Sequence, residues 1–211
     1  MFRRILIANR GEIALRIARA CRELGVKTVT VYSEADRDAP WLDETDEPVC
    51  VGPARADASY LNAESILQAA EQHDCQAIHP GYGFLAENAV FAARCEQQGI
   101  TFIGPGARSI RRMGDKVEAK RSMAAAGLPT IPGSDGALGG AEEAVKLANR
   151  IGYPVLLKAS AGGGGRGMRR CEDEAGVTRA YDEAAFEAAS AFGNPELYLE
   201  KLIEGGRHIE I

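Results

Sequence analysis

Lys158-Ala-Ser-Ala-Gly-Gly-Gly-Gly-Arg-Gly-Met-Arg169 lies between two segments that predict strands. The apolar run from Gly152 to Leu157 leads into it, and a mixed apolar and basic run leads out of it. A run of glycines leaves the backbone bare, so that a ligand can approach it closely. Backbone N–H groups together with Lys and Arg side chains are what a polyphosphate requires. We therefore expect a hairpin whose glycine tip covers phosphates and whose base carries Lys158 as a phosphate contact. The alternative is a surface linker.

The same stretch contains the pattern G-x-G-x-x-G at Gly162, Gly164 and Gly167. A dinucleotide-binding fingerprint opens a helix directly after its last glycine. Here the next helical pattern starts only near Asp173, so a dinucleotide-linked oxidoreductase is disfavoured. No Gly-Lys-Ser/Thr closes the stretch, so it is not a Walker A loop either.

The composition is that of an ordinary globular protein. The chain has 211 residues, 45% of them hydrophobic and 26% charged, enough for one large or two small domains. Its net charge of -5 argues against a nucleic-acid binder. The five cysteines and three histidines are scattered without a C-x-x-C pair, so no metal site is predicted. No apolar run approaches the roughly 18 residues of a membrane span. We expect a cytoplasmic protein, or a mitochondrial-matrix one after loss of a transit peptide, without membrane contact.

Strand and helix patterns alternate through the first half of the chain. Apolar or β-branched runs predict strands at 4–8, 27–32, 48–51, 76–79 and 100–103. Helical spacing predicts helices at 13–24, 63–73 and 88–98, with a polar loop at 33–47. This alternation is typical of an α/β domain with a parallel sheet. The domain is expected to end near residue 112.

A helix is predicted at 115–126, and a turn at 131–136 is the expected hinge. A second, smaller unit begins at this hinge. Helices are predicted in it at 141–151 and 173–192, and strands flank the glycine run and recur at 196–202 and 208–211. Because the sequence stops inside a predicted strand, we expect it to be a piece of a longer protein.

Two further positions are candidates for ligand contact. Lys116 lies in the first turn of a predicted helix, where a cation opposes the helix dipole unless an anion shares the site. Glu200 to Ile203 either completes a plain strand or forms a hinge whose backbone pairs with a base edge. His79 is the last residue of the predicted parallel strand at 76–79, and we interpret it as structural rather than catalytic.

Several blocks together resemble the biotin carboxylase family. They fall in the family's order over nearly the whole chain: Ile5–Ala14, His79–Asn88, Phe102–Pro105, Met113–Lys116, Pro132–Gly136, Lys158–Met168 and Arg207–Ile211. One small departure is Ala161, where some members have a further glycine.

The resemblance implies a fold and a set of ATP contacts. The fold is a Rossmann-like pre-ATP-grasp domain at 1–112, ATP-grasp linker helices and an α+β lid at 113–203, and the start of the ATP-grasp core at 204–211. The lid tip, residues 160–167, would be mobile without nucleotide. By the family's pattern the ATP contacts are the phosphate lysines, two lid glycines, the adenine hinge and a ribose neighbour: Lys116, Lys158, Gly164, Gly165, Glu200, Lys201, Leu202, Ile203 and His208.

The resemblance also implies an activity. The parent enzyme would carboxylate carrier-bound biotin with ATP, Mg²⁺ (or Mn²⁺) and bicarbonate through carboxyphosphate, within an acetyl-CoA/propionyl-CoA-type carboxylase of fatty acid biosynthesis. Its partners would be a biotin carboxyl carrier protein or domain, a carboxyltransferase and a second copy, contacted through the helix of Arg16, Arg19 and Glu23. In the family the magnesium glutamates, the bicarbonate and biotin contacts and the catalytic arginine lie beyond residue 211. No catalytic or metal-binding residue is therefore expected within this chain, and it should be inactive alone.

Two other functions stay open at this level. One is another ATP-grasp ligase, of the carbamoyl-phosphate or purine-synthesis type. The other is a non-catalytic nucleotide-binding or assembly module.

Overall fold

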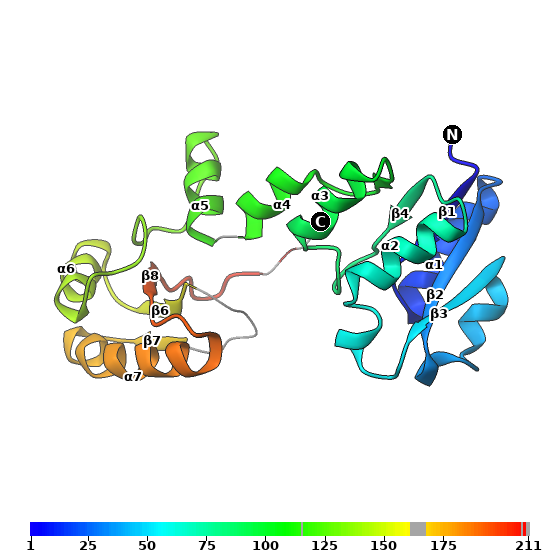
Figure 1. The fold of residues 1–211 in the computed structure, drawn as a ribbon. Helices are drawn as coiled ribbons and strands as arrows, with labels where there is room; N and C mark the ends of the chain where they lie inside the picture. The colour runs from blue at the N-terminus through cyan, green and yellow to red at the C-terminus, as the bar shows by residue number, and fades with distance from the viewer. Residues whose placement is uncertain (115, 161–167, 208, 210–211) are drawn as a thin grey trace. The chain divides into compact units, whose positions relative to one another are not determined.

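The chain divides into two compact units, Met1–Gly114 and Asp115–Ile211. The computed structural model describes residues 1–114, 116–160, 168–207 and 209, with only the backbone at position 116. Figure 1 shows the elements of each unit along the chain, and each unit is treated separately below.

The first unit contains a five-stranded parallel sheet. Its strands are β1 (Arg4–Ile7), β2 (Lys27–Ser33), β3 (Glu47–Gly52), β4 (Ala77–His79) and β5 (Thr101–Phe102), in the spatial order β3-β2-β1-β4-β5. Every neighbouring pair is parallel, which confirms the predicted α/β class. The order reverses between β1 and β4, as in Rossmann-like sheets, so a crevice is expected beyond the carboxyl ends of these two strands.

Helices cover both faces of this sheet. They are α1 (Gly11–Glu23), α2 (Ala63–Gln72), α3 (Ala89–Gln97) and α4 (Ala107–Gly114). Because side chains alternate along a strand, Ile5 and Ile7 pack with α1 while Leu6 packs with α2 and α3. Asn62 and Asn88 cap α2 and α3, each accepting a hydrogen bond from a backbone N–H three residues on.

Two local features differ from the sequence expectation. The polar segment 33–47 is not a plain loop, because short 3₁₀ helices form at Glu34–Asp36 and Pro40–Glu44. Helix α4 was not predicted at all. Its apolar residues Ala107, Ile110 and Met113 recur at helical spacing, but the helix has only eight residues, so the pattern is too short to stand out.

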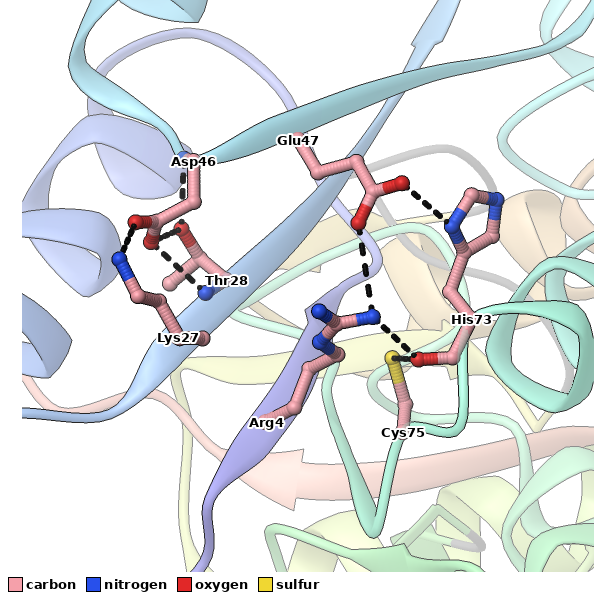
Figure 2. Close-up of polar contacts among 7 residues, drawn as sticks. All are labelled: Arg4, Lys27, Thr28, Asp46, Glu47, His73 and Cys75. Atoms are coloured by element: carbon pink, nitrogen blue, oxygen red, sulfur yellow. Dashed lines mark hydrogen bonds and ion pairs between the residues drawn. The ribbon is translucent and has the colours of Figure 1, made fainter.

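The amino end of the sheet is closed by charged and polar pairs (Figure 2). Glu47 at the start of β3 accepts from His73 Nδ1 at 2.8 Å and lies 3.5 Å from Arg4 of β1. Asp46 accepts from Lys27 Nζ at 2.7 Å and from Thr28 of β2. These contacts tie β1, β2 and β3 together, and they lie at the opposite edge from the crevice. His73 is therefore a structural residue.

The second unit is built on a three-stranded antiparallel sheet in the order β7-β6-β8. Its strands are β6 (Val155–Ala159), β7 (Arg169–Cys171) and β8 (Leu197–Lys201), and its helices are α5 (Lys116–Ala125), α6 (Ala141–Ile151) and α7 (Glu174–Phe192). Val155 pairs with Cys171, which confirms that the two predicted strands on either side of the glycine run pair antiparallel. Helices α6 and α7 pack on one face of the sheet around Leu157, Val177 and Leu199. The predicted mobility at 160–167 falls, except for Ser160, outside the described residues, as does most of the predicted strand at 208–211.

Candidate functional site

The face of the second sheet that points away from α6 and α7 carries three polar side chains. Along β6, Val155 and Leu157 turn toward the helices, so Lys158 points to the other face. The strand register places Lys158 opposite Tyr198 and Leu156 opposite Glu200. Lys158, Tyr198 and Glu200 therefore share one face. Leu197 and Leu199 lie on the core face, and both are fully buried as expected for plain strand residues.

Two lysines converge on the single carboxylate of Glu200, and we call Lys120, Lys158 and Glu200 the lysine–glutamate cluster. Lys158 Nζ donates to Glu200 Oε2 at 2.6 Å, and Lys120 Nζ, from α5, lies 3.6 Å from Glu200 Oε1. The Lys158 ammonium also lies 5.8 Å from the centre of the Tyr198 ring. Burial, with the negative charge of Glu200 beside it, raises the pKa of Tyr198 to about 12. Tyr198 is therefore uncharged at neutral pH and lines the cluster.

The cluster carries more positive than negative charge. It holds two ammonium groups and one carboxylate, and the side chain of Glu200 is only 12% exposed. Lys120 Nζ is buried and has no hydrogen-bond partner among the described residues. A buried ammonium with unused donors is costly unless an acceptor completes it. The arrangement therefore suits an anionic ligand.

A short segment beside β8 fixes the position of the cluster. Ser134 N donates to Leu199 O and Lys201 N donates to Pro132 O, both at 2.8 Å, and Gly133 forms an antiparallel bridge with Glu200. A Cβ atom at Gly133 would lie 2.3 Å from Leu199 O and 2.8 Å from Lys120 Nζ. Only glycine allows the strand and the lysine to approach this closely.

The predicted hinge from Glu200 to Ile203 is partly defined by the contacts of Lys201 and Leu202. Lys201 Nζ donates to Tyr153 O at 2.6 Å and to Gly152 O at 3.2 Å, so this side chain ties β8 to the start of β6. Leu202 N donates to Pro154 O at 3.1 Å. Ile203 is exposed. Lys201 is thus held against backbone carbonyls and does not join the lysine–glutamate cluster.

Four of the predicted contacts cannot be placed with side chains. Lys116 lies at the start of α5, one helical turn before Lys120, with only its backbone described. Gly164, Gly165 and His208 lie outside the described residues.

Lys120 was missed by sequence reasoning. Its only local signal is its spacing, because it lies four residues after Lys116 and so on the same side of a helix. Nothing in the sequence near residue 120 indicates that this lysine meets a carboxylate eighty residues later. The side-chain role of Glu200 was missed for the same reason.

At the carboxyl edge of the first sheet the polar residues bond to one another. Asn9 Nδ2, after β1, donates to the carbonyls of Pro80 and Tyr82, each at 2.7 Å. His79 Nδ1 accepts from Gly81 N at 3.1 Å, and burial lowers the pKa of His79. A neutral imidazole that accepts a local backbone hydrogen bond supports the structural interpretation of His79.

Neither the dinucleotide fingerprint nor a metal cluster finds support in the described part of the chain. The segment after the glycine run is β7, antiparallel to β6, whereas a dinucleotide site requires a helix there. Over the residues with assigned positions, no group of three or more His, Cys, Asp or Glu side chains is placed to hold a metal ion. No described helix is long and apolar enough to cross a membrane.

Comparisons with known proteins agree with one another. The family profile "Biotin carboxylase, N-terminal domain" matches residues 1–110, and "Carbamoyl-phosphate synthase L chain, ATP binding domain" matches residues 115–211. Biotin carboxylase of Pseudomonas aeruginosa is 56% identical over all of this chain and 47% of its own length.

Two solved structures are also similar to this chain. A biotin carboxylase from Campylobacter jejuni, in complex with β-γ-ATP, is 54% identical with a TM-score of 0.89, over 97% of this chain and 46% of its own. The biotin carboxylase domain dimer of Hydrogenobacter thermophilus 2-oxoglutarate carboxylase, with MgADP and bicarbonate, is 54% identical with a TM-score of 0.87, over 97% and 45%. The chain spans about half the length of these relatives. It belongs to the biotin carboxylase family.

Proposed function

We propose that this chain is the ATP-binding N-terminal portion of a biotin carboxylase. The parent enzyme would carboxylate carrier-bound biotin with ATP and bicarbonate through carboxyphosphate. The observation that carries the proposal is the lysine–glutamate cluster at the base of the glycine hairpin. Lys158 there is the last polar residue of β6 before the glycines, and it sits in a cluster with surplus positive charge.

The residues present fit a nucleotide with its phosphates. Lys158 would contact phosphate oxygens, because its ammonium group can leave the carboxylate of Glu200 and form charge-assisted hydrogen bonds with a phosphate instead. Lys116 and the backbone at Gly164 and Gly165 would complete the phosphate contacts. The segment from Glu200 to Ile203 would hold the base, and His208 would lie near the ribose.

Magnesium and biotin belong to the parent enzyme in this proposal. Mg²⁺ (or Mn²⁺) would neutralise charge on the transferred phosphoryl group. By the family resemblance the magnesium ligands of the parent enzyme lie beyond residue 211, and we propose none among the described residues of this chain. The chain should therefore bind ATP without cleaving it.

The partners and the acceptor are proposed by analogy with the family. We propose that the parent works with a biotin carboxyl carrier protein or domain and a carboxyltransferase in an acetyl-CoA/propionyl-CoA-type carboxylase in the cytoplasm. The helix with Arg16, Arg19 and Glu23 would contribute to a homodimer, and a relative was solved as a dimer. A 2-oxo acid is the second candidate acceptor, because a 54% identical relative is a 2-oxoglutarate carboxylase small subunit.

A calorimetric titration of the purified chain with ATP tests the proposal. ATP should bind, NADH should not, and Lys158→Met should weaken ATP binding at least about tenfold, as expected when one charge-assisted hydrogen bond is lost. Lys146→Met, an exposed lysine in α6, is the matched control and should leave binding unchanged. Equal binding of NADH would overturn the proposal, and bicarbonate-dependent cleavage of ATP would overturn the assignment of the chain as catalytically incomplete.

A further inference from the structure

We infer that Lys120 is a positioning residue that takes over the carboxylate of Glu200 when Lys158 turns to an anionic ligand. The inference rests on the proposed ATP function and adds a residue that the family resemblance does not assign. It concerns how the lysine–glutamate cluster keeps its buried charges paired with and without ligand.

The unequal spacing of the two lysines is the starting point. Lys158 Nζ is hydrogen-bonded to Glu200 Oε2 at 2.6 Å, whereas Lys120 Nζ stands 3.6 Å from Glu200 Oε1. At 3.6 Å, Lys120 Nζ and Glu200 Oε1 form an ion pair but no hydrogen bond. Lys120 Nζ has no hydrogen-bond partner among the described residues. One lysine is therefore fully engaged with the carboxylate and the other has donors to spare.

A phosphate ligand would change this balance. If Lys158 moves to a phosphate oxygen, the carboxylate of Glu200 loses its hydrogen-bonded cation inside a site where it is 12% exposed. Leaving a buried charge without a partner is strongly unfavourable. Lys120 needs to move by less than about 1 Å to reach hydrogen-bond distance from the carboxylate. The carboxylate then stays paired in both states, and the cost of releasing Lys158 falls.

The surroundings hold Lys120 in place for this role. Its Nζ lies against the backbone of Gly133, where an added Cβ would meet it at 2.8 Å. Gly133 is itself bridged to Glu200, so the lysine, the loop and the carboxylate are held as one group. A lysine that served only solubility would point its ammonium to solvent, and this one is buried.

A double-mutant cycle on ATP affinity tests the inference in the intact chain. Lys120→Met should weaken ATP binding about tenfold, because Glu200 would be left unpaired in the bound state. In a Glu200→Gln background, Lys120→Met should change the affinity by less than about twofold, because no charge remains to be neutralised. Lys120→Arg should keep most of the affinity for ATP, and Lys146→Met should again have no effect on it.

The possible results separate the two proposals. If the unmodified chain fails to bind ATP, the proposed function fails and this inference with it. If the chain binds ATP and Lys120→Met has no effect, only the inference fails. An equal loss in both backgrounds also overturns it, because Lys120 would then contact the ligand directly. A urea unfolding curve for each variant identifies any loss of affinity that reflects misfolding. If Lys120→Met is misfolded, Lys120→Arg and Lys120→Gln are compared instead: Lys120→Arg should bind ATP more tightly than Lys120→Gln, and equal affinities would overturn the inference.

Discussion

Asp36, in the first unit, illustrates how single buried charges are stabilised in this protein. It accepts hydrogen bonds from the guanidinium of Arg10, from Tyr60 Oη at 2.5 Å and from Ser33 Oγ at 3.3 Å. Burial alone would raise the pKa of Asp36, but the hydrogen bonds from Arg10, Tyr60 and Ser33 outweigh it and hold the pKa below its ordinary value of 3.8. The carboxylate is therefore charged in the folded protein at neutral pH.

Replacing this carboxylate should cost stability in a pH-dependent way. At pH 7, Asp36→Asn should lower the free energy of unfolding by about 2 kcal/mol, because charge-assisted hydrogen bonds are lost in a buried site. Since the folded-state pKa lies below the unfolded one, the stabilisation is complete above the ordinary value of 3.8 and is lost as the pH falls through the folded-state value. Urea unfolding at pH 7, 5 and 3 measures the gap between the two proteins, which should narrow toward pH 3.

Asp57→Asn is the control for this experiment. Asp57 also pairs with an arginine, but its side chain is 59% exposed. Exposed pairs contribute little, so this variant should leave the free energy of unfolding close to that of the unmodified chain. A gap for Asp36→Asn that widens on acidification, or that equals the control, would contradict the assignment.

At the residue scale, the sequence pointed to Lys158 because this lysine follows an apolar run and lies four residues before Gly162, the first residue of the glycine run. Its contact with a phosphate stays a prediction. Lys120 and the carboxylate of Glu200 were missed, since each has meaning only through a partner on another element. Pairing between distant residues is set by tertiary packing, which short-range periodicity does not contain.

At the scale of elements, the contact between the 132–134 segment and β8 determines how the cluster is held. The bridge between Gly133 and Glu200 leaves no room for a side chain. Gly133→Ala should therefore destabilise the second unit by about 1–3 kcal/mol through overpacking. It should also weaken ATP binding, because Glu200 and Lys120 would be displaced. Urea unfolding and calorimetry measure the two effects.

Gly136→Ala in the same loop is the matched control. A Cβ there would meet only the end of the Arg121 side chain, at 3.4 Å, which is an ordinary contact. Stability and affinity should both stay close to those of the unmodified chain. If both alanine variants behaved alike, the close approach at Gly133 would not be what holds the cluster.

Elements with a strong repeating pattern were predicted closely, and those without one were not. The predicted helix at 141–151 is α6 residue for residue, because it has an apolar stripe and a glycine on either side. Helix α4 was missed because it has only eight residues, so its apolar positions Ala107, Ile110 and Met113 form too short a pattern to be recognised. The two-residue strand β5 was predicted too long, since neighbouring apolar residues extend its pattern beyond its pairing.

At the scale of the whole molecule, the two units each have their own hydrophobic core. From the sequence we expected a parallel α/β part that ends near residue 112 and, after it, a part with a hairpin. The proposed ATP contacts all belong to the second unit, whereas the crevice expected from the Rossmann-like strand order belongs to the first. The unit in which ATP binds therefore tests the proposed contacts more directly than the affinity for ATP does.

Hydrogen–deuterium exchange with and without ATP tests the central claim most directly. ATP should slow backbone exchange in β6 and β8 and in α5, all in the second unit, because ligand binding opposes local opening. Lys158→Met should remove this effect at the same ATP concentration. Slowed exchange confined to the turns after β1 and β4 of the first unit, or no change at millimolar ATP, would contradict the account.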